Sequence, residues 1–319
     1  WSHQVQAAQT ALDGRHVVVA TGTASGKSLA YQLAVASTLA EDPRATVLYL
    51  SPTKALGADQ LASWTRIAAQ GMPELQVAPY DGDTDPAERV WARQHASVIL
   101  TNPDMLHVGI LPHHERWADF FRRLAYVVVD ESHTYRGVFG SQVAILLRRL
   151  RRIAAHYRRD RAETVFMGAS ATSAAPAEHF SQLIGAEAVQ VSEDGSPHGA
   201  VTVAFWEPEL TDRRGEHGAP VRRSATATAA DLVTDLALQG VRTLAFITSR
   251  RGAESISSIA RSQLDQVEPG LGGRIAAYRS GYLPEERREL EAQLRSGELL
   301  GMASTPALEM GIDIAGLDA

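Results

Sequence analysis

The sequence predicts an α/β protein with two doubly wound parallel sheets in tandem. Short apolar strands alternate with helical patterns in the first half, and a second alternating series begins near residue 225. Glycines and prolines interrupt regular structure between about 185 and 223. A chain of 319 residues is also too long for one ordinary α/β core. We therefore expect one domain at residues 1–190 and a second, truncated one at 191–319.

Short apolar runs, many of them β-branched, predict the strands of the first domain. They are Val17–Ala20, Thr46–Leu50, Val98–Leu100, Val127–Val129 and Val165–Met167. Because helical patterns separate them, they favour βαβ units and a parallel sheet covered on both faces.

The second domain is predicted to begin with a strand at Ala200–Trp206 and a loop-rich stretch at about 208–224. Helices are expected at Ala227–Leu238, Gly252–Leu264 and Pro284–Leu294. The strands expected between and after them are Thr243–Ile247, Arg274–Tyr278 and Leu300–Ser304.

Composition limits the classes of protein. Hydrophobic residues make up 45% and charged residues 21%, as in a soluble globular protein. No apolar run reaches the roughly 18 residues that span a bilayer. The first residues have neither the basic nor the apolar segment of a signal peptide, so nothing suggests export. With no cysteine, the chain has no disulfide or thiolate metal site. We expect a cytoplasmic protein without a membrane partner, nucleoid-associated if it is bacterial.

The segment Thr21–Ser28 is the most informative motif. It follows the strand Val17–Ala20 and opens a helical pattern through Leu29 and Leu33. A strand, a small-residue turn and a helix N-terminus present backbone N–H groups to phosphates. We expect Lys27 to contact the β- and γ-phosphates and Ser28 to hold Mg²⁺. The residues predicted to bind the nucleotide here are Thr23, Ala24, Ser25, Gly26, Lys27 and Ser28.

A second motif follows about a hundred residues later, where an apolar strand ends in Asp130 and Glu131. Ligands of open α/β sheets bind at this carboxyl edge. Asp130 is suited to hold Mg²⁺, and Glu131 to orient or deprotonate an attacking water. Alone, the pair would more simply cap a helix. Together with Lys27 and Ser28 it indicates ATP hydrolysis.

Asp130–His133 form a DExH box, and the chain resembles the superfamily-two helicases. Their motifs follow in order at Ser51–Leu56, Thr101–Asp104, Ser170–Thr172, Phe246–Arg250 and Thr305–Asp313. Thr21, which stands where the phosphate loop usually begins with glycine, suits this superfamily.

The residues within and around these motifs resemble those of the MrfA/SftH-type DNA helicases, which are relatives of a fungal RecQ-like repair helicase. The matching segments are Ser2–Gln4, Thr21–Leu29, Asp130–Gly140 and Tyr278–Tyr282. The resemblance implies two RecA-like domains of the P-loop NTPase class, with ATP and Mg²⁺ as cofactors. It also implies 3′–5′ movement on single-stranded or tailed duplex DNA, a role in repair, and a cysteine-bearing zinc domain beyond the helicase core.

The resemblance also carries roles to individual residues. It implies that Gln4 pairs with adenine. Ser170 and Thr172 connect the γ-phosphate site to the domain interface, and His133 couples the acidic box to the second domain. Gly311 and Asp313 close on the nucleotide, with Asp313 on the ribose.

A nucleic-acid track is expected where strands hand over to helices. Hydroxyls, amides and backbone N–H groups there bind phosphates without reading bases, so an acidic chain of net charge −6 can still bind DNA. A helix N-cap is the alternative role for each residue, and the two roles can coexist. The residues are Thr53, Lys54, Thr101, Asn102, Thr248, Ser249, Arg250, Ser304 and Thr305.

Two further clusters are given simpler explanations. A dense arginine group on one helix favours a solvated or partner-facing surface over a direct DNA contact; it comprises Arg148, Arg149, Arg151, Arg152, Arg158, Arg159 and Arg161. His107, His113 and His114 have no acidic or cysteine neighbour at a useful spacing, so no zinc site is expected.

The motif with the arginine finger, expected beyond Asp313, is not in the sequence, and Pro306 removes a backbone donor beside Thr305. We therefore expect a fragment that binds ATP–Mg²⁺ and DNA but hydrolyses ATP weakly. Two alternatives stay open: an RNA helicase of the same superfamily, or a nucleotide-dependent nucleic-acid-binding module. The oligomeric state is not predicted.

Overall fold

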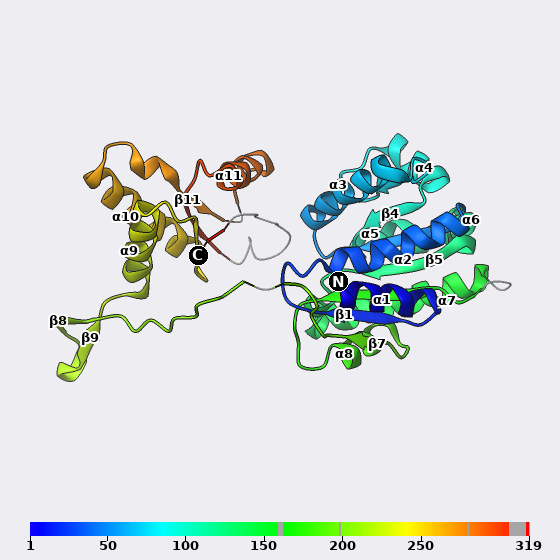
Figure 1. Ribbon diagram of the computed structural model, residues 1–319, viewed down its shortest axis with the longest axis horizontal. Helices are drawn as coiled ribbons and strands as arrows, with labels where there is room; N and C mark the ends of the chain where they lie inside the picture. The colour runs from blue at the N-terminus through cyan, green and yellow to red at the C-terminus, as the bar shows by residue number, and fades with distance from the viewer. Residues whose placement is uncertain (159–161, 198, 280, 306–316, 319) are drawn as a thin grey trace. The chain divides into compact units, whose positions relative to one another are not determined.

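The structure is a computed structural model that describes residues 1–158, 162–197, 199–279, 281–305 and 317–318. The chain forms two compact units, Trp1–Gly199 and Ala200–Ala319 (Figure 1). Each unit is an α/β structure with its own parallel sheet, which confirms the predicted fold class.

The sheet of unit 1 has the strand order β3-β4-β2-β5-β6-β1-β7, and all of its neighbouring pairs are parallel. The five predicted strands are present, and two three-residue edge strands are added. The strands are β1 (Val17–Ala20), β2 (Thr46–Leu50), β3 (Val77–Pro79), β4 (Val98–Thr101), β5 (Leu124–Val129), β6 (Val165–Ser170) and β7 (Val189–Val191).

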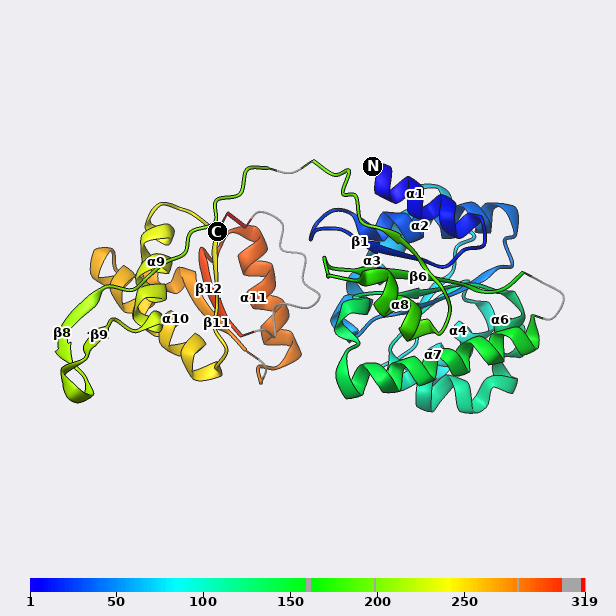
Figure 2. The same cartoon turned by 90° about the horizontal axis from the view of Figure 1, so that it is seen from below.

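Helices cover both faces of this sheet because alternate strand residues point to opposite sides. Val17 and Val19 pack with the first helices, whereas Val18 packs with the later ones. One face carries α1 (Ser2–Leu12), α2 (Lys27–Glu41) and α3 (Lys54–Gly71). The other carries α4 (Pro86–His95), α6 (Ala118–Arg123), α7 (Gly137–Tyr157) and α8 (Pro176–Ile184) (Figure 2).

Short helical turns complete unit 1: α5 (Pro103–Met105), η1 (Leu106–Ile110), η2 (Leu111–Trp117) and η3 (Ser132–Thr134). Aromatic side chains fill the core beneath them, with Trp117 lying edge-on to both Tyr80 and Phe120. In the part of the chain that the structure describes, no helix has both the length and the apolar composition to cross a bilayer.

The division between the units falls later than the predicted residue 190. Val191 is the register partner of Val19, so β7 belongs to the first sheet. Beyond β7, Asp194 accepts a hydrogen bond from the backbone of Gly22, at 3.2 Å. These contacts are made with unit 1, which extends to Gly199.

Unit 2 contains a three-stranded parallel sheet in the order β10-β12-β11, between α10 and α9 on one side and α11 on the other. The strands are β10 (Thr243–Phe246), β11 (Ile275–Tyr278) and β12 (Gly301–Ser304). The helices are α9 (Ala225–Leu238), α10 (Arg250–Val267), η5 (Leu271–Arg274) and α11 (Pro284–Ser296). These elements match the predicted ones within a few residues.

Two predictions before α9 are wrong. The residues at 200–206 form no strand, and Val201, Val203 and Phe205 are exposed, because this apolar alternation pairs with no other strand of the described chain. The loop-rich stretch expected at about 208–224 instead contains a hairpin. It consists of β8 (Leu210–Arg214), the turn η4 (Glu216–Gly218) and the antiparallel strand β9 (Pro220–Arg222).

Candidate functional site

The phosphate loop lies between β1 and α2 at the carboxyl edge of the unit 1 sheet. Ala24 has φ +60° and Gly26 has φ +70°, so the chain turns through two left-handed residues before the helix begins. A Cβ on Gly26 would lie 2.6 Å from the Nε2 of Gln4, which would have to move to admit a larger residue. The hydroxyls of Thr21 and Ser25 are 2.6 Å apart. Thr21 therefore braces the loop with a bond that glycine could not make.

Lys27 is the cation of this loop. Its Nζ donates to the carbonyl of Gly22 at 2.7 Å and to that of Thr21 at 3.3 Å. Burial lowers its pKa, while the carboxylates of Glu131 and Asp130 act in the opposite direction. The ammonium group is thus held between the loop and the acidic pair, where a phosphate group would meet it.

Asp130 is a nearly buried carboxylate, 6% exposed, at the end of β5. It accepts hydrogen bonds from the Tyr49 hydroxyl and, at 2.9 Å, from the backbone N–H of Glu131. Burial raises its pKa to about 6, although the bond from Tyr49 acts to lower it. A buried carboxylate of this kind gains stability from a nearby cation, so its chemistry fits a bound divalent metal.

Glu131 occupies a left-handed backbone conformation, with φ +47° and ψ +42°. Such a conformation is costly for a non-glycine residue and is found preferentially at functional sites. Its carboxylate lies 3.2 Å from the Nδ1 of His133. The same nitrogen accepts a hydrogen bond from the backbone of Ala171 at 3.1 Å. His133 therefore connects the acidic pair with the segment that follows β6.

Ser28, the predicted metal ligand, is held by a residue that sequence reasoning missed. Gln60 on α3 donates to the Ser28 hydroxyl at 3.2 Å and accepts from Tyr31 at 2.9 Å. Among the described residues no group of three His, Cys, Asp or Glu side chains could hold a metal ion. Ser28 and Asp130 would hold Mg²⁺ together with phosphate oxygens and water, as this ion commonly requires.

The N-terminal helix α1 closes one side of the loop. Gln4 donates to the Gly26 carbonyl at 2.9 Å, and the Nε2 of His3 lies 2.9 Å from the Ser25 carbonyl. Asp194 and Gly195 approach from beyond β7, and the backbone of Gly195 donates to the Nδ1 of His3 at 3.2 Å. The contacts of His3 and Asp194 with the phosphate loop were not predicted, because no local sequence pattern indicates a contact between segments so far apart in the chain.

The remaining nucleotide candidates lie in different places. Ser170 is buried and donates to the Ala171 carbonyl at 2.8 Å. Thr172 lines a groove between α7 and α8. Gly311 and Asp313 lie outside the described residues.

Three of the nucleic-acid candidates of unit 1 meet in one cavity of about 260 Å³, beside β3, β4 and α3. Lys54, Thr101 and Asn102 line it together with Ser51 and others. Thr53 caps α3 by accepting a hydrogen bond from Leu56, at 3.3 Å. The structure thus brings together residues from the segments after β2 and β4.

These side chains already have partners. Lys54 pairs with Asp83 at 2.7 Å, and both groups are largely exposed, so the pair contributes little stability. The Thr101 hydroxyl donates to the Tyr80 carbonyl at 2.6 Å, and Asn102 accepts from Met105 at 2.9 Å. Lys54 is the side chain best placed to exchange its partner for a phosphate.

The candidates of unit 2 gather at the carboxyl ends of β10 and β12. Ser249 caps α10 by accepting from Gly252 at 3.0 Å, and Thr248 and Arg250 flank it. Ser304 is fully buried, and its hydroxyl donates to the Thr305 carbonyl at 2.7 Å. Direct contact with a ligand is therefore open to Thr248 and Arg250 rather than to the Ser304 side chain.

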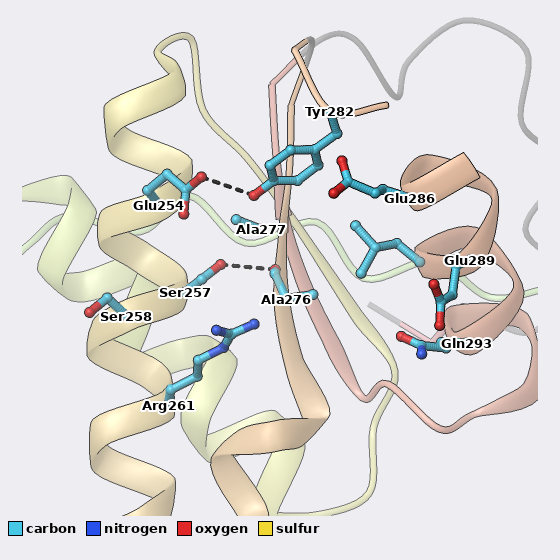
Figure 3. A pocket seen from close by; sticks show the side chains of 11 residues that line it. Glu254, Ser257, Ser258, Arg261, Ala276, Ala277, Tyr282, Glu286, Glu289 and Gln293 are labelled. Carbon is cyan, nitrogen blue, oxygen red and sulfur yellow. Dashed lines mark hydrogen bonds between the residues drawn. The ribbon is translucent and has the colours of Figure 1, made fainter. Parts of the chain in front are cut away.

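Unit 2 also contains a cavity of about 590 Å³ between α10, β11 and α11 (Figure 3). Glu254, Glu286 and Glu289 lie on its walls, and Glu254 accepts a hydrogen bond from Tyr282 at 2.9 Å. Arg261 donates to the Ile275 carbonyl at 2.7 Å. The predicted residues of unit 2 do not line this cavity, and its three carboxylates are unsuited to a nucleic-acid backbone.

The basic cluster on α7 has mostly structural contacts. Arg148 donates to the Gln182 carbonyl at 2.8 Å, and Arg151 donates to the Gly185 carbonyl at 2.7 Å, at the end of α8. Arg158 donates to the Ala162 carbonyl, at 2.9 Å from Nη2. Arg159 and Arg161 lie outside the described residues. Away from this cluster, His114 bonds with the Tyr157 hydroxyl at 2.8 Å.

Comparisons with known proteins agree with this geometry. The family model of the DEAD/DEAH box helicases matches residues 1–180. A curated protein of Bacillus subtilis, the uncharacterized ATP-dependent helicase YprA, is 42% identical over 99% of this chain and 41% of its own length. The ATP-dependent helicase HRQ1 of Saccharomyces cerevisiae is 40% identical over the whole chain and 30% of its own length.

A solved structure is also similar. The crystal structure of the DUF1998 helicase MrfA bound to DNA and AMPPNP superimposes with a TM-score of 0.91 at 42% identity. The superposition covers 99% of this chain and 43% of that one. The chain therefore spans less than half the length of the relatives that it matches.

Proposed function

Because the chain belongs to the DEAD/DEAH box helicase family, we propose that it supplies the nucleotide site of an ATP-dependent DNA helicase. Hydrolysis of ATP would be coupled to movement on single-stranded DNA. The two most similar curated relatives described above are named as ATP-dependent helicases, and MrfA has been crystallised with DNA.

The convergence of Lys27, Asp130 and Glu131 at one sheet edge is the observation that carries the proposal. The charges of both carboxylates act to raise the pKa of Lys27, and the charge of Lys27 acts to lower the pKa of both carboxylates. Lys27 would bind the terminal phosphates, and Asp130 with Ser28 would hold Mg²⁺. The metal, when bound, neutralises charge that develops on the phosphoryl oxygens.

Glu131 is proposed as the group that positions and deprotonates the attacking water. Burial raises its pKa, so it is a stronger base than an exposed carboxylate. Its neighbour His133 bonds to the backbone of Ala171. We propose that this contact carries the state of the γ-phosphate site to the segment containing Ser170 and Thr172.

For the nucleic acid, we propose a track over Thr53, Lys54, Thr101 and Asn102 in unit 1. In unit 2 it would use Thr248, Ser249, Arg250 and Thr305. Lys54 and Arg250 supply the charge, and helix starts supply backbone donors. Movement in the 3′–5′ direction and a role in DNA repair are part of the proposal, since they follow from the resemblance to the MrfA-type helicases.

The test uses the full-length protein that contains this chain, with ATP hydrolysis measured with and without single-stranded DNA. Lys27→Ala should abolish hydrolysis and weaken nucleotide binding. Glu131→Gln should bind nucleotide normally while its turnover falls about 10³-fold or more. DNA-stimulated hydrolysis at the normal rate in either variant would disprove the assignment.

Strand displacement on 3′- and 5′-tailed duplexes tests the direction. The proposal expects unwinding of the 3′-tailed duplex and little of the 5′-tailed one. Matched single-stranded RNA is the comparison for the choice of nucleic acid. Stronger stimulation by RNA than by DNA of equal sequence would replace the DNA helicase by an RNA helicase.

A further inference from the structure

A groove of about 810 Å³ lies between α7 and α8 in unit 1. The two helices pack on the same face of the sheet (Figure 2). Because α7 follows β5 and α8 follows β6, the groove begins at the sheet edge that carries the nucleotide site. Its lining begins with Tyr135 and Arg136 on one side and with Thr172 and Ser173 on the other.

The groove is basic in an acidic protein. Arg136, Arg148 and His179 line it, and no Asp or Glu is among its lining residues, although the chain has a net charge of −6. In the described part of the chain, the Arg136 guanidinium has no hydrogen-bond or ion-pair partner. Arg148 uses one nitrogen on the Gln182 carbonyl and has no carboxylate partner there. Two positive charges therefore face an opening without their own counter-ions.

Polar atoms in the groove also lack partners. The Tyr135 side chain is 2% exposed, and its hydroxyl has no hydrogen bond to any described residue. The Nε2 of His179 is buried and is likewise unsatisfied among the described residues. A buried donor without a partner costs stability unless a ligand or water satisfies it. The Tyr135 hydroxyl is a donor in addition to the arginines, and the His179 nitrogen donates or accepts according to the tautomer of the ring.

Both helices begin at the mouth of the groove without a side-chain cap. Arg136 at the start of α7 and Ala175 at the start of α8 make no side-chain cap hydrogen bond. The free N–H groups and positive dipole ends of two helices favour an anion at this place. Ser173, two positions before Ala175, also lines the groove and carries a hydroxyl.

A hydrophobic side chain also lines the groove. Ile145 on α7 is 68% exposed. An exposed apolar side chain beside arginines suits single-stranded nucleic acid, whose bases make apolar contacts while its phosphates pair with the cations. A purely anionic small molecule would leave this apolar group unused.

We propose that the α7–α8 groove binds a single-stranded nucleic-acid segment, separate from the track over Lys54 and Asn102. Arg136 and Arg148 hold its phosphates, and Ile145 packs against a base. The sequence favoured a solvated or partner-facing role for the α7 arginines, and the groove gives Arg148 a different one. The inference rests on the proposed nucleic-acid binding, which it extends to a second surface.

The groove also lies next to the catalytic segment. Arg136 and His133 both lower the pKa of His179, after burial, so the three groups are close enough to interact electrostatically. An occupant that pairs with Arg136 would change the field at His133, which contacts Glu131. Nucleic acid in the groove is thus placed to influence hydrolysis.

The first experiment measures binding of fluorescein-labelled oligothymidylate to the full-length protein at several salt concentrations. Arg136→Gln should weaken binding about 5- to 10-fold and reduce the salt slope by about 0.7, the value for one lost phosphate contact. Arg136→Lys should restore most of the affinity. Arg152→Gln removes the same charge from the exposed surface of α7 outside the groove and should change affinity less than 2-fold.

The second experiment locates the strand directly. A photo-cross-linking residue in place of Ser173 should attach to the oligonucleotide, and the same residue in place of Arg152 should not. Wild-type affinity and salt slope in Arg136→Gln, or cross-linking at position 173 to protein alone, would overturn the groove assignment. Absence of oligonucleotide binding by the wild-type protein would instead reject nucleic-acid binding as a whole.

Discussion

The carboxylate of Asp194 accepts a hydrogen bond from the backbone N–H of Gly22, 172 positions earlier in the chain. The other oxygen of this carboxylate accepts from both the backbone and the hydroxyl of Ser196, at 2.9 and 2.6 Å. Asp194 therefore connects the first turn of the phosphate loop to the segment that follows the last strand of the sheet.

Asp194→Ala is expected to lower the free energy of unfolding of unit 1 by about 2 kcal/mol, because hydrogen bonds to a charged acceptor are lost from a half-buried position. Nucleotide affinity should fall with it, since the loop loses a brace. Urea unfolding followed by tryptophan fluorescence and a fluorescent-nucleotide titration measure the two effects. Glu193→Ala, at an exposed neighbour, should leave both unchanged; equal behaviour of the two variants would contradict the role of Asp194.

Asp130 should make unit 1 less stable as the pH rises. Its pKa is about 6 in the folded protein and about 4 in an unfolded chain, so the folded state binds more protons between these values. Its stabilising contribution is complete below about pH 4 and lost above about pH 6. The free energy of unfolding of Asp130→Asn should thus exceed that of the wild type by about 2–3 kcal/mol at pH 8 and differ little from it at pH 4.

Urea unfolding at the two pH values checks this prediction. The exposed Asp104 offers the control, since Asp104→Asn should show no such pH-dependent gain. A gain in Asp130→Asn that is the same at pH 4 and pH 8 would mean that titration of the carboxylate is not its cause.

Tyr49→Phe should shift the acid limb of the ATPase pH profile to higher pH. The Tyr49 hydroxyl bonds to Asp130 and lowers its pKa, so its removal raises that pKa. In the proposed mechanism the ionised carboxylate of Asp130 holds the metal, so hydrolysis by the variant would need a higher pH. Tyr126→Phe, which removes a hydroxyl bonded to Thr38, is the matched control and should leave the limb in place. If the acid limb of the pH profile were unchanged in Tyr49→Phe, titration of Asp130 would not be its cause.

Gly140→Ala is expected to destabilise unit 1 by at least ~2 kcal/mol. A Cβ at this position would lie 2.2 Å from the backbone oxygen of Tyr135, which cannot move without the turn before α7. Gly71→Ala adds the same methyl group at the end of α3, where nothing lies within 4 Å, and should be neutral or slightly stabilising. Differential scanning calorimetry would show the contrast, and similar melting temperatures would argue against the close approach.

Much of the fold could be predicted because its information is local. Strands such as Val17–Ala20 are continuous apolar runs, and the small residues of the phosphate loop follow directly. The edge strands β3 and β7 escaped prediction because neither is a continuous apolar run: Val77–Pro79 ends in proline, and Gln190 interrupts Val189–Val191. The strand expected at Ala200–Trp206 was wrong for the opposite reason: its alternation is clear, but pairing depends on a partner that no local pattern specifies.

The same distinction applies to the candidate site. Lys27, Asp130 and Glu131 were identified from contiguous motifs, and the structure places them within mutual electrostatic reach. Tyr49 and Gln60 were missed because their roles depend on which strand or helix lies beside β5 and α2. The roles assigned to the nucleic-acid candidates stay predictions. The Ser304 side chain is buried, which leaves it unable to contact a strand directly.

The course of the chain after β7 has a mechanical consequence. This edge strand lies beside β1, so residues 194–196 pass the phosphate loop and the start of α1 before the chain reaches unit 2 at residue 200. The covalent tether between the units is thus anchored at the nucleotide site. A tension on that tether would act first on the bonds that Gly195 and Asp194 make with His3 and Gly22, without passing through the body of the sheet.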